Sequence, residues 1–280
     1  MSLSATSSGL QVATHQAAVL ILGGTAAYGL DLAPYRPLDD PESISTPYGA
    51  SPPIVFLQPD GAVAPVAFIS RHGHDRLQRS AAFLNHRALM WAARELGAQV
   101  VFSWNGTGAI AAHLEVGDLV TPHDFLDFTR TRVTTFGHEM MRAATGTAFH
   151  PAARTALLAA LQGAPAAEQA APAGSIRFHT SGVYVCTEGP RLETTSEIAL
   201  YAGAGADLVG MTLSPEVFLA QEAGLAYASL CFITNYATGR AAGRPPRRQF
   251  GPEVAHTCLP LLMAAARHWV TDAHRRPAAP

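Results

Sequence analysis

Short apolar runs that end in glycine and polar residues recur along the chain, and stretches with helical spacing of apolar residues lie between them. The apolar runs cover residues 18–24, 67–74, 100–108 and 228–235. Their length and their bounding residues predict buried strands. The helical patterns cover about 81–97, 152–162, 193–204, 215–224 and 252–270. Strands that alternate with helices in this way predict an α/β fold with a largely parallel or mixed sheet.

The carboxyl ends of the predicted strands are the first place to expect a ligand, because open α/β sheets bind ligands there. Four strands end in the polar and glycine-rich segments GGTAAYG (23–29), ISRHGHDR (69–76), WNGTGAI (104–110) and FITNYATG (232–239). A further segment, VGMTLSPE (209–216), closes another strand, and its Ser214 and Pro215 suit the N-cap and the first turn of a helix.

Two of these segments carry groups that suit an oxyanion. Arg71 offers a fixed fork of donors that matches phosphate oxygens, and the neighbouring His72 donates a proton when charged or accepts one when neutral. The turn at 23–29 offers backbone N–H groups and the hydroxyl of Thr25. A surface Arg–His pair and an ordinary tight turn are the alternative interpretations. A metal pair of His72 and His74 is weaker, because no cysteine accompanies the two histidines, and we expect no metal.

Other polar residues at the strand ends suit a nucleobase or a phosphate. Asn235 carries a carboxamide, which both donates and accepts, as reading a purine edge requires. Glu193 is either a favourable first-turn charge of a helix or a carboxylate that accepts N–H donors from a base. Thr212 is either a turn threonine or a phosphate hydroxyl. Because the sequence has no G-x-S-x-G motif and no cysteine with a basic neighbour, it favours a single displacement by an external nucleophile.

The composition removes several classes of enzyme. The chain has 280 residues, a formal net charge of −2 and 19 basic residues, all of them arginine. Without lysine there can be no Schiff base, no P-loop lysine and no protein-kinase lysine. The near-neutral charge gives no general reason to expect binding to nucleic acid or to a membrane. Any anion must therefore be held by arginine, histidine, hydroxyls or backbone N–H groups.

One domain over 17–272 is the expected organisation for a chain of this length. Residues 1–16 are rich in Ser, Thr and Ala and residues 273–280 are rich in Pro and Ala, so we expect both ends to be disordered. Three widely spaced cysteines suit a reduced cytosolic protein better than a disulfide scaffold. No apolar run reaches the roughly 18 residues of a membrane span, and the N-terminus does not resemble a signal peptide. We therefore expect a cytoplasmic protein.

Nine short segments resemble the purine nucleoside phosphorylase family, in its methylthioadenosine and methylthioinosine phosphorylase branch. They are ILGGT (21–25), TPYGAS (46–51), ISRHG (69–73), NHRALMWAARELGA (85–98), NGTGAI (105–110), GDLVTPHDFLD (117–127), GVYVCTEGPRLET (182–194), GADLVGMTLSPEVFLAQEAGLAYAS (205–229) and TNYATG (234–239). One such segment is a weak signal, but nine in the same order over about 20–260 are a strong one. The resemblance implies a three-layer α/β/α fold with a mixed central sheet.

Members of that family cleave the N-glycosidic bond of a purine nucleoside with inorganic phosphate, without a metal, another cofactor or a covalent intermediate. The resemblance assigns the phosphate contacts to Thr25, Arg71, His72, Asn105, Gly106 and Thr212. Phosphate held under C1′ by Arg71 would stabilise the positive charge that builds on the sugar and then attack it. The catalytic residues implied are Arg71, His72 and Asn235, the last as a hydrogen-bond partner of N7 on the departing base.

For the ribose and the base, the resemblance implies contacts with Met211, Leu192, Glu193 and Asn235. Glu193 can accept the N1–H of a 6-oxopurine, whereas a 6-aminopurine lacks that proton and would leave the carboxylate poorly paired. The adenine-specific branch typically carries Asp-Tyr-Asp where this chain carries Asn235-Tyr236-Ala237. We therefore expect methylthioinosine, inosine or guanosine as the substrate, ahead of methylthioadenosine.

The group at the 5′ position of the sugar stays open. His256 is either a hydrogen-bond partner of a 5′-hydroxyl or an ordinary histidine on a helix face. Family members of this size complete the 5′ pocket with a neighbouring subunit, so the resemblance implies a homotrimer. Residues 136–150 are our candidate for the segment that the neighbour contributes.

Two loops depart from the family pattern. Ala26 and Ala27 follow Gly-Gly-Thr where the family usually has a glycine, although alanine does not readily adopt a positive φ. The segment 74–84 is one residue longer than usual. These departures motivate one alternative, a catalytically weak nucleoside-binding protein. A second alternative is a phosphatase with His72 as the nucleophile, since Arg-His-Gly after a strand is also the signature of that class, although there it usually follows the first strand.

Overall fold

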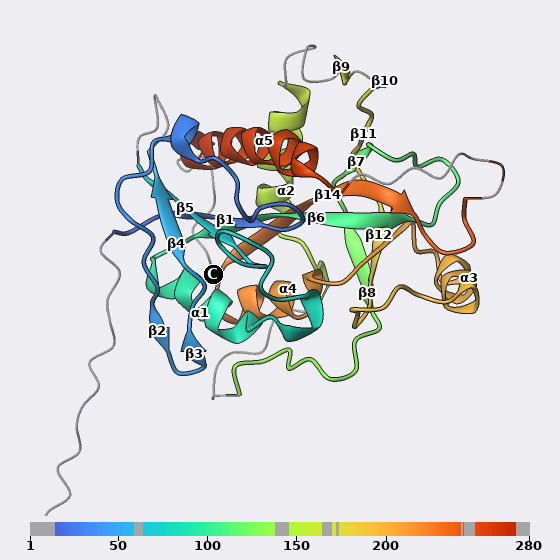
Figure 1. The fold of residues 1–280 in the computed structure, drawn as a ribbon, viewed down its shortest axis with the longest axis horizontal. Helices are drawn as coiled ribbons and strands as arrows, with labels where there is room; N and C mark the ends of the chain where they lie inside the picture. Colours follow the sequence, from blue (N-terminus) through green and yellow to red (C-terminus); the bar gives the residue numbers. More distant parts are fainter. Residues whose placement is uncertain are drawn as a thin grey trace, which may run out of the picture.

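The computed structural model describes residues 15–58, 64–137, 146–163, 170–171, 174–241, 243 and 250–272. Almost all of the two ends expected to be disordered, 1–16 and 273–280, lies outside these residues. So does the stretch 138–145 of the segment proposed to reach a neighbouring subunit. Within the described residues, a mixed sheet lies between two layers of helices, as expected (Figure 1).

The sheet has ten strands in the described part of the chain and contains the four predicted ones. Its main path follows the order β11-β7-β14-β6-β1-β5-β4, and β13, β12 and β8 extend it from β6. The strands are β1 (Val19–Gly23), β4 (Ile54–Leu57), β5 (Val66–Ser70), β6 (Val100–Ala109), β7 (Leu119–Val120), β8 (Asp124–Asp127), β11 (Phe178–His179), β12 (Val183–Cys186), β13 (Leu208–Gly210) and β14 (Ala226–Tyr236). The pairs β4–β5, β7–β14 and β6–β13 are antiparallel and the others parallel, which makes the sheet mixed. Two short hairpins lie outside it: β2 (Ser45–Thr46) with β3 (Gly49–Ala50), and β9 (Ala170–Ala171) with β10 (Gly174–Ser175).

Helices cover both faces of the sheet because its strands alternate their apolar side chains between the faces. The helices are α1 (His86–Glu95), α2 (Pro151–Gln162), α3 (Thr195–Gly203), α4 (Leu213–Glu222) and α5 (Pro252–Thr271), with 3-10 turns at Ala33–Tyr35 and Ala81–Phe83. In β1, Leu20 and Leu22 pack with α1 and α4, whereas Val19 and Ile21 pack with α2 and α5. Figure 1 shows these two helix pairs on opposite sides of the sheet and α3 at its edge. No helix in the described part of the chain combines the length and the apolarity needed to cross a membrane.

The helix expected over 81–97 begins late, at His86. Leu84 is extended, with φ −73° and ψ 140°, so the preceding 3-10 turn does not continue into the helix. Asn85 then caps the first turn, because its side chain accepts from the N–H of Ala88 at 3.1 Å. The residues just before this cap are therefore a loop, and they lie next to the cavity described below.

The helix expected over 193–204 also begins late, at Thr195. A capping box of Thr194 and Glu197 closes its first turn, in which each side chain accepts from the other residue's backbone N–H. Glu193 is thus left in the turn before the helix. Its carboxylate takes no part in the capping box and accepts a hydrogen bond from Thr187 instead.

The long strand β6 changes partners along its length, and this change creates the site. Its first half pairs in parallel with β1, as in the register Val19↔Val100. Its last residues pair with the antiparallel strand β13, as in the register Leu208↔Ala109. Because β13 is antiparallel to β6, the residues that follow β13 return toward the end of β1. The ends of β1, β13 and the middle of β6 therefore meet.

Candidate active site

A cavity of about 300 Å³ opens where the predicted strands end. It is lined by residues that the sequence already singled out: Thr25, His72, Asn105, Gly106, Leu192, Glu193, Met211, Thr212 and Asn235. Tyr28, Leu77 and Phe250, which the sequence did not single out, add apolar surface. A cavity of this size and mixed character suits a small organic ligand. The structure thus brings most of the predicted site into one place.

The turn after β1 presents the hydroxyl of Thr25 to the cavity. Trp104 Nε1 donates to the Thr25 carbonyl at 3.0 Å, and the N–H of Gly106 donates to Thr25 Oγ1 at 3.2 Å. Gly24 must be a glycine here, because a Cβ atom would clash with the carbonyl oxygen of Trp104 on β6. The turn is therefore held tightly against β6.

Ala26 adopts the conformation that a glycine would normally supply in this turn. Its φ is 60°, in the left-handed region that alanine disfavours. The N–H of Ala27 closes the turn onto the carbonyl of Gly24 at 3.1 Å. A non-glycine residue in this region costs about 1 kcal/mol. The alanine therefore strains the turn but does not open it.

The structure places Arg71 beneath the wall of the cavity, where the sequence predicted a direct phosphate clamp. Its side chain is fully buried and does not line the cavity. Nη1 donates to Asn105 Oδ1 at 2.7 Å and to Thr212 Oγ1 at 2.8 Å, and both of these residues do line the cavity. The guanidinium thus orients two groups of the wall.

Glu216 on α4 explains the buried position of Arg71. Its Oε2 lies 3.2 Å from Nη2 of Arg71 and accepts from the hydroxyl of Tyr227 at 2.7 Å. Its Oε1 lies 3.2 Å from Nδ1 of His86. Although burial opposes it, the charge of Arg71 and the hydrogen bonds from His86 and Tyr227 hold the pKa of Glu216 below its ordinary value. An ion pair with hydrogen-bonded neighbours therefore lies directly under the cavity.

Burial and the neighbouring charge of Arg71 keep His72 neutral. Together they lower the pKa of His72 to about 4, although its contact with the Arg79 carbonyl opposes the shift. Nδ1 lies 3.0 Å from that carbonyl oxygen, so the proton of the neutral ring belongs on Nδ1. Nε2 is then an acceptor, which suits the O–H group of a hydrogen phosphate. Of the two roles that the sequence left open for His72, the structure favours the acceptor.

Lowering the pH from about 6.5 to about 4.5 is expected to cost wild-type protein about 1–2 kcal/mol more stability than it costs a His72→Gln variant. The pKa of His72 is about 4 in the folded protein and 6.5 in an unperturbed chain, so the unfolded chain binds more protons in this window. Stability then falls as the pH falls. Denaturant unfolding at both pH values, in buffer without phosphate, measures the difference. Equal losses in the two proteins would show that His72 is not the titrating group.

Glu193 and Asn235 supply polar groups for a base. Thr187 donates to Glu193 Oε1 at 2.6 Å, which leaves Oε2 as an acceptor. Asn235 Oδ1 accepts from the Thr234 hydroxyl at 2.9 Å, and Nδ2 donates one proton to the Tyr236 carbonyl at 2.9 Å. The second proton on Nδ2 remains for a ligand. One acceptor and one donor match the N1–H and the N7 of a 6-oxopurine.

Arg132 fastens two parts of the cavity wall together, and nothing in the sequence pointed to it. Nη1 donates to the carbonyls of Met211 and Ser214, each at 2.5 Å, and Nη2 donates to the carbonyl of Glu188 at 2.8 Å. The side chain is 6% exposed. It therefore ties the end of β13 to the turn that carries Glu193.

His256 does not reach the cavity, so the structure supports its interpretation as a helix-face histidine. It is exposed on α5, whereas Val254, Ala255 and Cys258 form the buried face of that helix. Phe250, which precedes the helix, lines the cavity instead. The structure therefore gives no support to a hydrogen bond from His256 to a 5′-hydroxyl.

Comparison with known proteins agrees with this geometry. The family model described as the phosphorylase superfamily matches residues 20–265. A probable S-methyl-5′-thioinosine phosphorylase from Methanothermobacter thermautotrophicus is 40% identical over 78% of this chain and 71% of its own. A 6-oxopurine nucleoside phosphorylase from Pyrococcus furiosus is 34% identical over 79% of this chain and 80% of its own. The crystal structure of a methylthioadenosine phosphorylase from an Antarctic soil metagenomic library matches with a TM-score of 0.77 at 27% identity, covering 92% of this chain and 88% of that one.

Proposed function

Because this chain belongs to the phosphorylase superfamily, we propose that it cleaves the N-glycosidic bond of a 6-oxopurine nucleoside with inorganic phosphate. S-methyl-5′-thioinosine is the substrate we place first, ahead of inosine and guanosine, and its products are hypoxanthine and 5-methylthioribose 1-phosphate. The observation that carries the proposal is one cavity in which Thr25 and Thr212, suited to an anion, meet Glu193 and Asn235, suited to a base. The activities named for the Methanothermobacter and Pyrococcus relatives support a 6-oxo base.

Phosphate binds, in this proposal, at the ends of β1 and β13 and the middle of β6. Thr25 and Thr212 lie along that wall. The N–H of Gly106 donates to Thr25 Oγ1, which leaves the proton of the Thr25 hydroxyl for a phosphate oxygen, and His72 accepts a hydrogen bond from the O–H of a hydrogen phosphate. Arg71 orients Thr212 from below and adds a buried positive charge. Directional donors of this kind position an anion for attack. Inorganic phosphate is the co-substrate, and the reaction takes no other cofactor.

The chemistry is a displacement at C1′ of the sugar. As the C1′–N9 bond breaks, its electron pair leaves with the purine, and a phosphate oxygen forms the new bond to C1′. The departing base then takes a proton from water, which gives neutral hypoxanthine. Asn235 donates to N7 and so stabilises the negative charge that builds on the base. Glu193 accepts from N1–H, a proton that adenine lacks, so a 6-aminopurine would leave the carboxylate unpaired.

Apolar side chains of the cavity favour an apolar 5′ substituent in this proposal. Leu77 is 57% exposed and Phe250 is 49% exposed, and both line the cavity. A methylthio group that covers such side chains removes apolar surface from water, which is favourable. His256, the candidate partner of a 5′-hydroxyl, lies on the exposed face of α5. We therefore rank the methylthio nucleosides ahead of the hydroxyl forms.

A substrate panel that varies the base and the 5′ group tests the proposal. The wild-type protein receives S-methyl-5′-thioinosine, inosine, S-methyl-5′-thioadenosine and adenosine, each with and without phosphate, and the released base is quantified by chromatography. We expect phosphate-dependent release, with kcat/KM about tenfold or more higher for the 6-oxo bases. A preference for the 6-amino members would instead identify a methylthioadenosine phosphorylase. Tight binding without turnover would identify a nucleoside-binding homologue.

We also propose that the protein is a cytoplasmic homotrimer that serves purine salvage. Its three cysteines are free and buried, which suits a reducing compartment. Phe83 is 71% exposed and Val133 is 47% exposed, and both line a hollow beside His86. Large exposed apolar side chains of this kind favour contact with another subunit.

A further inference from the structure

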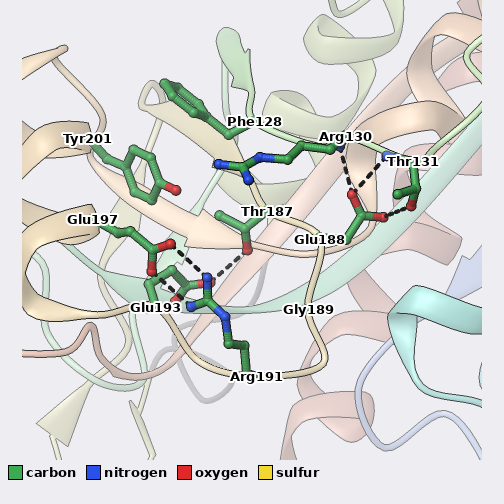
Figure 2. A pocket seen from close by; sticks show the side chains of 10 residues that line it. All are labelled: Phe128, Arg130, Thr131, Thr187, Glu188, Gly189, Arg191, Glu193, Glu197 and Tyr201. Carbon is green, nitrogen blue, oxygen red and sulfur yellow. Dashed lines mark hydrogen bonds and ion pairs between the residues drawn. The ribbon is translucent and has the colours of Figure 1, made fainter.

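A second pocket lies behind the base end of the cavity, and Glu193 lines both. The segment 189–193 separates the two: Pro190 and Leu192 line the cavity, and Gly189 and Arg191 line the second pocket. Figure 2 shows this pocket, in which Thr187 points at Glu193 and a hydrogen bond joins them. The carboxylate that is proposed to read the base is therefore held from behind, by a residue outside the base cavity.

The backbone on both sides of Glu193 is fixed. Arg191, which precedes Glu193 by two residues, donates to both carboxylate oxygens of Glu197, at 2.8 Å and 2.7 Å (Figure 2). Glu197 also accepts from the N–H of Thr194 at 2.7 Å, as part of the capping box of α3. The position of the Glu193 backbone is thus set by its neighbours. The direction of its carboxylate needs a separate contact.

Thr187 makes that contact. Its own backbone is anchored, because its N–H donates to the carbonyl of Gly210 at 2.9 Å. Its hydroxyl has one proton, and Oγ1 lies 2.6 Å from Glu193 Oε1 but 3.4 Å from the Gly210 carbonyl. The proton therefore goes to the carboxylate, where the bond is charge-assisted. Thr187 and Glu193 are each 7% exposed, so water does not readily replace this donor.

A carboxylate held in this way offers one specific oxygen to a base. With Oε1 occupied by Thr187, Oε2 is the acceptor left for an N–H donor. Without the hydroxyl, Glu193 would lose this fixed donor, and its side chain would be free to turn toward other partners, Arg191 among them. A side chain turned toward another partner would no longer reject a 6-aminopurine, because the penalty for an unpaired acceptor would be gone.

We propose that Thr187 is a specificity-determining positioning residue, which orients Glu193 as the acceptor that selects a 6-oxo base over a 6-amino base. The inference rests on the proposed function, since it assigns the recognition of the base to Glu193. Thr187 itself does not line the base cavity, so it acts through Glu193 alone.

Thr187→Val removes the hydroxyl and keeps the shape, and Thr187→Ser keeps the hydroxyl. In Thr187→Val we expect the kcat/KM ratio of inosine to adenosine to fall about tenfold or more, because a hydrogen bond to a charged group is lost. The KM for phosphate should change by less than about twofold, since the phosphate groups lie on other strands. Thr187→Ser should restore the ratio to within about threefold of wild type. A purely structural role would instead lower kcat/KM for both nucleosides and weaken phosphate binding at the same time. That outcome would overturn the proposal.

Thr131→Val is the matched control. Thr131 also donates its hydroxyl to a glutamate, Glu188 Oε1, at 2.8 Å, but that carboxylate does not line the base cavity. The control loses the same kind of bond in the same pocket (Figure 2). Its inosine-to-adenosine ratio should equal that of wild type, and a fall equal to that of Thr187→Val would count against a specific role for Thr187.

Binding of the free bases separates a failure of this inference from a failure of the proposed function. Calorimetric titration with hypoxanthine and with adenine gives a discrimination ratio that needs no turnover. Wild-type protein that selects hypoxanthine but releases no base from any nucleoside would overturn the proposed function alone. An unchanged ratio of the two bases in Thr187→Val would overturn the inference alone.

Discussion

Replacing Glu216 with alanine is expected to lower the free energy of unfolding by about 3–5 kcal/mol. The change leaves the guanidinium of Arg71 buried without its counter-charge, in a site where both side chains are 0% exposed. It also removes the acceptor of the Tyr227 hydroxyl. Thermal and denaturant unfolding, measured without phosphate or nucleoside, give the loss. A loss within about 1 kcal/mol would show that water or a shifted neighbour replaces the carboxylate.

A double replacement separates the charge of this ion pair from the space that it fills. Arg71→Met combined with Glu216→Met removes both charges and keeps much of the side-chain volume. Apolar residues that replace a whole buried ion pair are often neutral or stabilising. The double variant should therefore recover most of the stability that Glu216→Ala loses. A double variant less stable than Glu216→Ala would contradict the account, because the packing rather than the unpaired charge would then dominate.

The same double variant is expected to lose about 10²–10³-fold in kcat/KM for phosphate while it stays folded. Without Arg71, the side chains of Asn105 and Thr212 lose the donor that orients them at the cavity wall. The positive charge beneath the phosphate disappears as well. Initial rates at saturating nucleoside and varied phosphate measure the effect, with the binding of hypoxanthine as a check on the base end.

Glu222→Gln is the control for that experiment. Glu222 is another buried carboxylate of α4, but it accepts from Thr135 and from the N–H of Phe136, away from the cavity. Its replacement should leave kcat/KM for phosphate within about threefold of wild type. If the double variant turned over phosphate as fast as this control, Arg71 would have no part in the reaction.

The strands and the wall of the cavity could be predicted because their signal is local. An apolar run that ends in glycine and polar residues marks both a buried strand and the place where a ligand binds. Thr25, Asn105 and Asn235 each stand near the polar end of such an apolar run. The resemblance to a known family added Thr212 and Glu193, whose own segments are ambiguous.

The position of Arg71 could not be predicted because its partner is remote in the sequence. Glu216 lies on a helix that is distant along the chain, and only the three-dimensional packing brings the two together. The sequence did hold one clue, since Glu216 stands in the apolar stretch of α4, where an unpaired carboxylate would be costly. The side of the helix on which His256 lies could be deduced from the sequence more easily. The buried spacing of Val254, Ala255 and Cys258 places it on the opposite face of α5.

Thr187 carries no signal of its own. A threonine directly after an apolar strand is common, and only the distance of 2.6 Å to Glu193 distinguishes it. The turn between the two residues brings them together, and turn geometry is hard to deduce from residue types alone. Contacts that orient another side chain thus escaped prediction, whereas most of the predicted residues do line the cavity.

The cavity is assembled from stretches of chain that can change independently, and this has a consequence for how such proteins diverge. The groups suited to phosphate come from the ends of β1 and β13 and the middle of β6, and those suited to the base come from the turn before α3 and from the end of β14. Matched proteins are named for both 6-oxopurine and methylthioadenosine activities on this scaffold. Substitutions in the turn and at the end of β14 can therefore alter the preference for a nucleobase while the anion site is inherited unchanged.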